Sequence, residues 1–166
     1  MPGLIIKGTT LMRKLVTAAL CCLILFVTLT GCGSSAKSLD MEAFSKEVLT
    51  KGSFNDELIL LSDKVVADYY DLSFDGLEEY RVCVSSSSAT ASEFALFKCS
   101  DDNALKSAKA AVEARISDQI SNYENYRPDE KFRLENALVE TNGNYLLFVV
   151  SDNNTTIQNL FNDALK

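Results

Sequence analysis

Apolar residues follow two different patterns along this chain. Near the N-terminus they form one unbroken run of 15 residues, Leu15–Leu29, directly after the basic pair Arg13-Lys14. As a helix this run would be about 22 Å long, shorter than the roughly 30 Å hydrocarbon core of a bilayer. A short apolar run behind basic residues is typical of a secretory signal. From about residue 40 onward, apolar residues recur instead at the spacings of amphipathic helices and strands.

The spacing predicts four helices in the second part of the chain. The longest, from about Asn103 to Tyr123, repeats apolar residues at intervals close to 3.6 and follows the capping group Asp101-Asp102. Charged residues of this helix, Arg115 among them, take positions outside its apolar stripe. The other three helices are expected at Met41–Leu49 behind the N-cap Asp40, at Asp63–Tyr70, and after Asp152-Asn153-Asn154.

Four strands are predicted, in two hairpins. Tyr80–Val84 alternates between apolar and polar residues, and Glu93–Cys99 is apolar on both sides. A third strand is expected over about Leu134–Glu140 and a fourth over Tyr145–Val150. The dipeptide Asn142-Gly143 between them is a strong signal for a two-residue turn, because both residues tolerate positive φ.

This order of elements favours an α+β fold. We expect a four-stranded, mainly antiparallel sheet with the long helix and the C-terminal helix packed on one face. The apolar run Leu58–Leu61 is too short to be assigned a type. The length of 166 residues indicates one domain, residues 40–166, whose short N-terminal helix could serve as a stalk.

The apolar run ends in Leu29-Thr30-Gly31-Cys32, which resembles the lipobox of bacterial lipoproteins. The resemblance implies a diacylglycerol on the Cys32 thiol and cleavage between Gly31 and Cys32, with Leu29, Thr30 and Gly31 recognised by the signal peptidase. Residues 1–31 would be removed, with translation starting at Met12, and residues 32–39 would be a lipidated, flexible tether. Two acyl chains give a stable anchor, so the domain is expected on the outer face of the cell membrane. The alternative is an ordinary signal peptide, or a short membrane span, with a chance cysteine.

Charge and residue types narrow the classes of function. The leader contains Lys7, Arg13 and Lys14 but no acid, so the mature chain has 13 bases against 23 acids, a net charge of −10. Such a surface repels phosphate, so nucleic acid is not expected as a partner. The chain has no histidine, the commonest general base near neutral pH and the commonest metal ligand. It also shows no catalytic motif, so we expect no catalytic residue, no cofactor and no metal.

Two cysteines, Cys83 and Cys99, lie on the two strands of the first predicted hairpin. An exported protein can form disulfides, but pairing depends on where the hairpin turns. A turn centred between Ser88 and Ala89 places Cys83 opposite residue 94, whereas a direct pair requires a turn centred on Ala91. The sequence leaves open a disulfide, two buried thiols or one exposed thiol.

Other polar and aromatic clusters have ordinary structural interpretations. Acidic groups at Glu78-Glu79, Asp101-Asp102 and Asp152 are interpreted as solvated charge and helix caps rather than as acid–base pairs or calcium ligands. The segment Ser85–Ser88 is interpreted as a tolerant surface loop. Tyrosines at helix ends are interpreted as packing at the edge of the core rather than as a ligand groove; they are Tyr69, Tyr70, Tyr123 and Tyr126.

Five short motifs follow one another in order: Leu61-Ser62-Asp63, Glu79-Tyr80, Glu93–Lys98, Tyr126-Arg127-Pro128 and Gly143-Asn144-Tyr145. In this order, over about Leu58–Leu165, the chain resembles a family of Gram-positive lipoproteins that carry a domain of unknown function. The resemblance implies an exported, lipid-anchored α+β domain. It implies no activity, and the lipidated cysteine is the single functional residue that it transfers.

Three hypotheses about function remain. The leading one is a non-catalytic binding or accessory module that holds a protein partner or a small ligand at the membrane face. The second is a regulator or inhibitor of an envelope enzyme, and the third is an envelope hydrolase that works through carboxylates. Two carboxylates about 5–10 Å apart in one pocket would favour the third. An exposed apolar patch or an unpaired sheet edge would favour a partner surface.

Overall fold

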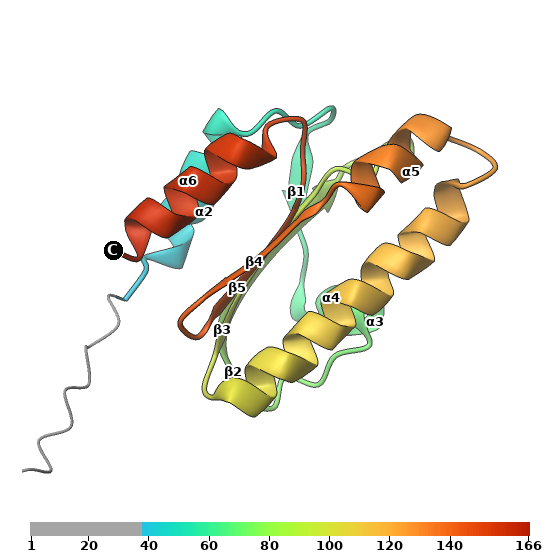
Figure 1. The fold of residues 1–166 in the computed structure, drawn as a ribbon. Coiled ribbons are helices and arrows are strands. Elements are labelled where there is room, and N and C mark those ends of the chain that lie inside the picture. Colours follow the sequence, from blue (N-terminus) through green and yellow to red (C-terminus); the bar gives the residue numbers. More distant parts are fainter. Residues whose placement is uncertain (1–37) are drawn as a thin grey trace, which may run out of the picture. The chain divides into compact units, whose positions relative to one another are not determined.

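The computed structural model describes residues 38–166, which form five strands and five helices (Figure 1). Their bounds are α2 Met41–Lys51, β1 Leu58–Leu60, α3 Asp63–Tyr70, β2 Leu77–Ser85, β3 Glu93–Cys99, α4 Asp102–Tyr123, α5 Pro128–Glu135, β4 Leu138–Asn142, β5 Tyr145–Val150 and α6 Asn154–Ala164. The expected signal sequence and the lipidation residue Cys32 lie outside the described residues. No helix within residues 38–166 is both long and apolar enough to span a bilayer.

The α+β class is confirmed, but the described residues form a sheet of five strands rather than four. All neighbours are antiparallel, in the order β1-β2-β3-β5-β4. The additional strand is β1, which pairs with β2 so that Leu58 lies opposite Ser85 and Leu60 opposite Cys83. Three apolar residues show no alternation from which a strand could be predicted, so only the pairing with β2 identifies this edge strand.

Helices cover both faces of the sheet (Figure 1). α3, α4 and α5 pack on one face, and α2 and α6 pack on the other. The prediction that the long helix and the C-terminal helix share one face was therefore wrong. The reason lies in β5, whose six residues are all buried and alternate between the two core clusters. A strand that is apolar on both faces requires cover on both.

The first helix is part of the core rather than a stalk. α2 buries Met41 and Phe44, and the rings of Phe44 and Phe161 on α6 lie 6.0 Å apart. As predicted, Asp40 caps α2, since its side chain accepts a hydrogen bond from the Ala43 amide at 2.9 Å. α2 and α6 together close the face of the sheet opposite α4.

The second hairpin is shifted relative to the prediction. Leu134 lies in α5, and β4 begins at Leu138. The turn consists of Gly143-Asn144 rather than Asn142-Gly143, because Asn142 pairs with Tyr145. Gly143 has a φ of +57°, and Asn144 does not have a positive φ. A glycine at the first central position with positive φ is the type II′ arrangement, which suits the twist of antiparallel strands.

Candidate binding groove

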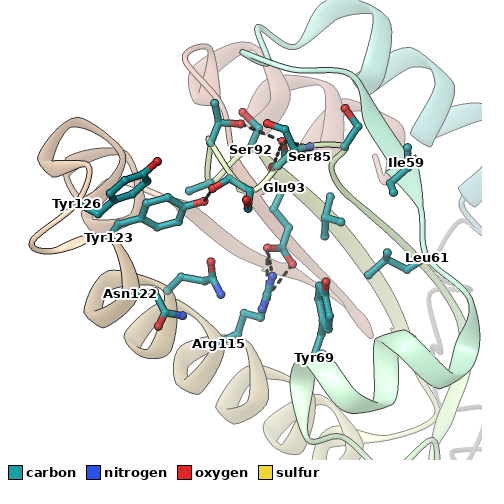
Figure 2. Close-up of a pocket in the computed structure, with 17 residues that line it drawn as sticks. Ile59, Leu61, Tyr69, Ser85, Ser92, Glu93, Arg115, Asn122, Tyr123 and Tyr126 are labelled. Atoms are coloured by element: carbon teal, nitrogen blue, oxygen red, sulfur yellow. Dashed lines mark hydrogen bonds and ion pairs between the residues drawn. The ribbon is translucent and has the colours of Figure 1, made fainter.

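A groove of about 590 Å³ opens on the face of the sheet that carries α3 and α4 (Figure 2). Residues of β2 and β3 line its floor, β1 and α3 one wall, and α4 the other. The loop that joins β2 to β3 closes one end. The volume lies within the range of about 300–1,000 Å³ that is usual for sites of small ligands.

A buried ion pair between Glu93 of β3 and Arg115 of α4 lies at the floor. The two side chains are only 4% and 11% exposed. Glu93 Oε2 accepts hydrogen bonds from Arg115 Nη2 at 2.9 Å and from Nε at 3.2 Å. Glu93 Oε1 accepts from Arg115 Nε at 3.1 Å and from the Tyr70 hydroxyl at 2.6 Å. Both carboxylate oxygens are therefore committed to contacts within the protein.

The surroundings of this pair keep Arg115 charged and Tyr70 neutral. Burial opposes the guanidinium charge, but the adjacent Glu93 carboxylate raises the pKa of Arg115 above its usual value. Burial, followed by the charge of Glu93, raises the pKa of Tyr70 well above its usual value. The Arg115 guanidinium also lies 4.5 Å from the centre of the Tyr69 ring, a cation–π contact. Its Nη1 has no hydrogen-bond partner among residues 38–166 and stays available to a ligand.

Polar side chains of α4 border the groove. The buried positions of this helix stop at Val112 and resume at Tyr123. Between them Arg115, Gln119 and Asn122 line the groove, at i, i+4 and i+7 on one side of the helix. Sequence reasoning placed Arg115 among the outward charges and did not single out the other two. A row of polar residues directly beside the apolar stripe was the signal that could have identified them.

Three of the four tyrosines that the sequence suggested as core-edge packing line the groove (Figure 2). Tyr123 and Tyr126 lie near the end of α4, and Tyr69 projects from α3 on the opposite side. Tyr126 is 72% exposed and Tyr69 44%. Tyr123 is buried, and its hydroxyl donates to the Ser88 carbonyl at 3.1 Å. Two aromatic rings are therefore accessible from the groove.

Asp56 organises the loop between β2 and β3. Its Oδ2 accepts hydrogen bonds from the hydroxyls of Ser85, Ser87 and Thr90 at 2.8, 2.7 and 2.9 Å. These hydrogen bonds, that of Ser87 first, lower the pKa of Asp56. The segment that the sequence suggested as a tolerant surface loop is thus held in one arrangement, with a row of hydroxyl groups at the end of the groove.

Replacing Asp56 with alanine should loosen this loop. The Ser87 amide donates to the Ser85 hydroxyl and the Ala89 amide to the Ser87 hydroxyl, at 3.1 and 3.2 Å. Without the Asp56 carboxylate these hydroxyls lose their shared acceptor, so both amides should exchange hydrogen faster while the amides of β3 do not. Hydrogen exchange followed by mass spectrometry measures this, with Glu57→Ala as the control. Equal loop exchange in the two variants would contradict the role of Asp56.

α5 holds the other end of the same loop through a buried glutamate. Glu130 is 1% exposed, and its Oε2 accepts from the Ala91 amide at 2.8 Å and from Arg133 Nη1 at 2.7 Å. Its Oε1 has no hydrogen-bond partner in the described part of the chain, although Arg127 Nη2 lies 3.6 Å away. Arg127 Nη1 in turn donates to the Ala89 carbonyl at 2.9 Å. The loop is therefore fixed from both sides.

Sequence comparison relates the chain to a described family. The family model "Domain of unknown function (DUF4358)" matches residues 51–151, more than half of the chain. The chain belongs to this family. All residues that line the groove of this DUF4358 domain lie inside the matched range, whereas α6 lies outside it. No curated protein and no solved structure matches the chain.

The disulfide that the sequence left open for this DUF4358 domain does not form. The register of β2 and β3 places Cys83 opposite Phe94 and Cys99 opposite Leu77, and the two cysteines belong to core clusters on opposite faces of the sheet. Both are free and buried within the described residues. Burial raises the pKa of Cys83 and raises that of Cys99 to about 11. Both therefore remain neutral thiols near pH 7, and a thiol must ionise to act as a nucleophile.

Acidic clusters of the DUF4358 domain serve as caps and ion-pair partners. Asp101 caps α4, since its side chain accepts a hydrogen bond from the Asn103 amide at 2.8 Å. Glu78 pairs with Lys98 at 2.7 Å. Within residues 38–166, no group of three or more His, Cys, Asp or Glu residues is arranged to hold a metal ion.

Proposed function

We propose that this protein is an exported lipoprotein, anchored to the outer face of the cell membrane by a diacylglycerol on Cys32. Its DUF4358 domain is a non-catalytic binding module, and the groove between α3, α4 and the β2–β3 loop is its ligand site. The lipid supplies the contact with the membrane, and the groove receives a small polar ligand.

The main support for a binding role, rather than a catalytic one, is that both carboxylate oxygens of Glu93 already accept hydrogen bonds within the protein. An acid or base that takes part in catalysis must reach the substrate and exchange a proton with it. Glu93 is 4% exposed, and its oxygens already accept hydrogen bonds from Arg115 and Tyr70. The accessible groups of the groove are amides, hydroxyls, aromatic rings and the Nη1 of the Arg115 guanidinium, all of which can bind a ligand without taking part in proton transfer.

The anchor rests on the agreement of four features of the sequence. Basic residues precede an apolar run of 15 residues, the run ends in the motif Leu29-Thr30-Gly31-Cys32, and small polar residues follow. A secretory signal of this kind carries the chain across the membrane. Two acyl chains on Cys32 then hold it there, since each buried methylene contributes about 0.8 kcal/mol.

A role in regulating or inhibiting an envelope enzyme is the second candidate, and the sheet edge supports it. β1 is an edge strand, and its Ile59 and Leu60 are 47% and 58% exposed. Such an edge can pair with a partner strand, although three residues make a short template. Hydrolysis by paired carboxylates has less support, because Glu93 is the only carboxylate among the described residues that line the groove.

Filling the groove should abolish ligand binding. Gln119 lines the groove on α4, whereas Ser117 is exposed on the same helix and does not line it. We expect the intact protein and a Ser117→Trp variant to retain a small molecule from a cell-envelope extract, and a Gln119→Trp variant to lose it. Native mass spectrometry of the three proteins, purified in a detergent without a sugar headgroup, measures the bound mass.

Circular dichroism establishes that both tryptophan variants are folded. The binding role is refuted if Gln119→Trp retains the same mass as Ser117→Trp, or if the unmodified protein retains no small molecule.

A further inference from the structure

The charges of the groove cancel. Among the described residues that line it, Glu93 and Arg115 carry the formal charges, and they are paired with each other. A charged ligand in the groove would find no free charge of opposite sign there, unless it separated the Glu93–Arg115 pair. Either arrangement leaves a buried charge without a partner, which is costly. The floor therefore selects an uncharged ligand.

The free polar groups match a ligand that is rich in hydroxyl groups. Gln119 and Asn122 make no side-chain hydrogen bonds within residues 38–166, and each amide can both donate and accept. Arg115 Nη1 adds a donor at the floor. A hydroxyl group likewise donates one hydrogen bond and accepts others, so several hydroxyls on one ligand can satisfy these amides and the guanidinium together.

The exposed rings supply flat apolar contacts beside these polar groups. Tyr126, in the turn after α4, and Tyr69, on α3, line opposite sides of the groove (Figure 2). The face of an aromatic ring is electronegative and attracts polarised C–H groups. A pyranose ring combines an apolar C–H face with hydroxyls at its edge, which is the combination that this groove offers.

We propose that the groove binds a neutral saccharide. The saccharide ring stacks on Tyr126, and its hydroxyls form hydrogen bonds with Asn122 and Gln119. The β2–β3 loop, whose hydroxyl groups donate to Asp56, closes the end of the site. A peptide fits less well, because β2 and β3, which form the floor of the groove, are each paired with strands on both sides and leave no free edge for an added strand. This inference rests on the groove being a ligand site, as proposed above.

Titration with two neutral trisaccharides, maltotriose and tri-N-acetylchitotriose, tests the proposal. The intact protein is used in a detergent without a sugar headgroup, and isothermal titration calorimetry measures affinity. We expect saturable binding of at least one probe. Asn122→Ala and Tyr126→Ala should each raise its dissociation constant roughly threefold to tenfold, by loss of hydrogen bonds or of stacking. Phe132→Ala, which removes an exposed ring on α5 outside the groove, should leave it unchanged.

Three results would overturn the saccharide assignment. The first is that neither trisaccharide binds. The second is that one trisaccharide binds with equal affinity to the unmodified protein and to both groove variants. The third is that an uncharged blocked tripeptide, acetyl-trialanine amide, binds instead, with an affinity that the groove variants lower. If a small molecule from the extract is still lost in Gln119→Trp, the groove remains a ligand site and the saccharide class alone is wrong. If Gln119→Trp has no effect on any ligand, the proposed function fails as well.

Discussion

Replacing Glu93 with alanine should lower the free energy of unfolding by about 3–5 kcal/mol, the cost of breaking a buried ion pair from one side. The change leaves the Arg115 guanidinium, 11% exposed, without its counter-charge. It also removes the acceptor of the Tyr70 hydroxyl, which is buried in the core. Urea unfolding followed by circular dichroism measures the loss from the shift in midpoint, provided that the slope is unchanged.

A double variant, Glu93→Leu with Arg115→Met, is the matched control. Because it removes both charges and retains apolar volume, it should recover much of the stability that Glu93→Ala loses. Glu93→Gln, which still accepts a hydrogen bond from Tyr70, gives an intermediate loss and replaces the alanine variant if that variant does not fold. A Glu93→Ala midpoint equal to that of the unmodified protein would show that the pair is not buried as described.

Local signals explain which elements the sequence predicted well. α3, β3 and β5 have the bounds that the spacing predicted, and α4 begins one residue earlier than expected. These elements have strong periodicity or a clear cap, such as Asp101 at the start of α4. The pairing of β2 with β3 also follows from their short connection, and Cys83 lies opposite Phe94, as a turn between Ser88 and Ala89 requires.

The predictions that were wrong concern elements whose existence, bounds or position depends on tertiary contacts. β1 has three residues and exists through its pairing with β2. Leu134 was assigned to a strand, but it is buried at the end of α5, where the helix packs against the core. The run in β5 correctly indicated a central strand, but it also required apolar cover on both faces. That requirement places α6 on the face of the sheet opposite α4.

The groove could be predicted only in part for a similar reason. Its ion pair joins residues 22 positions apart, on a strand and a helix whose relative placement no local pattern gives. Asp56 lies 29 positions before Ser85, and the pairing of β1 with β2 brings it within hydrogen-bonding distance of the β2–β3 loop. The individual signals, an acid at the start of an apolar strand and a serine-rich loop, are present in the sequence. Their convergence is a property of the fold.

Replacing Cys32 with serine should abolish lipidation completely. The diacylglycerol is expected to be joined to the chain through a thioether, which requires the cysteine sulfur, and a serine hydroxyl does not replace it. Because processing follows lipidation, the precursor should also remain uncut and keep residues 1–31. Metabolic labelling with a fatty acid measures the first effect, and the mass of the intact protein measures the second. Membrane fractionation is a poor measurement here, since the uncut apolar run Leu15–Leu29 can itself hold the precursor at the membrane.

Cys21 and Cys22 provide matched controls, because they lie in the same apolar run but not in the motif that ends it. Cys21→Ser and Cys22→Ser should leave both fatty-acid labelling and processing unchanged, with a mature chain that begins at Cys32. Thr30 and Gly31 are small enough to let the backbone enter a peptidase site, so Gly31→Leu should retain the label but slow the cleavage. Fatty-acid labelling that persists in Cys32→Ser, or a mature chain that begins at another residue, would contradict the anchor. In that case the groove would still be a ligand site, but on a protein held to the membrane by other means or released from it.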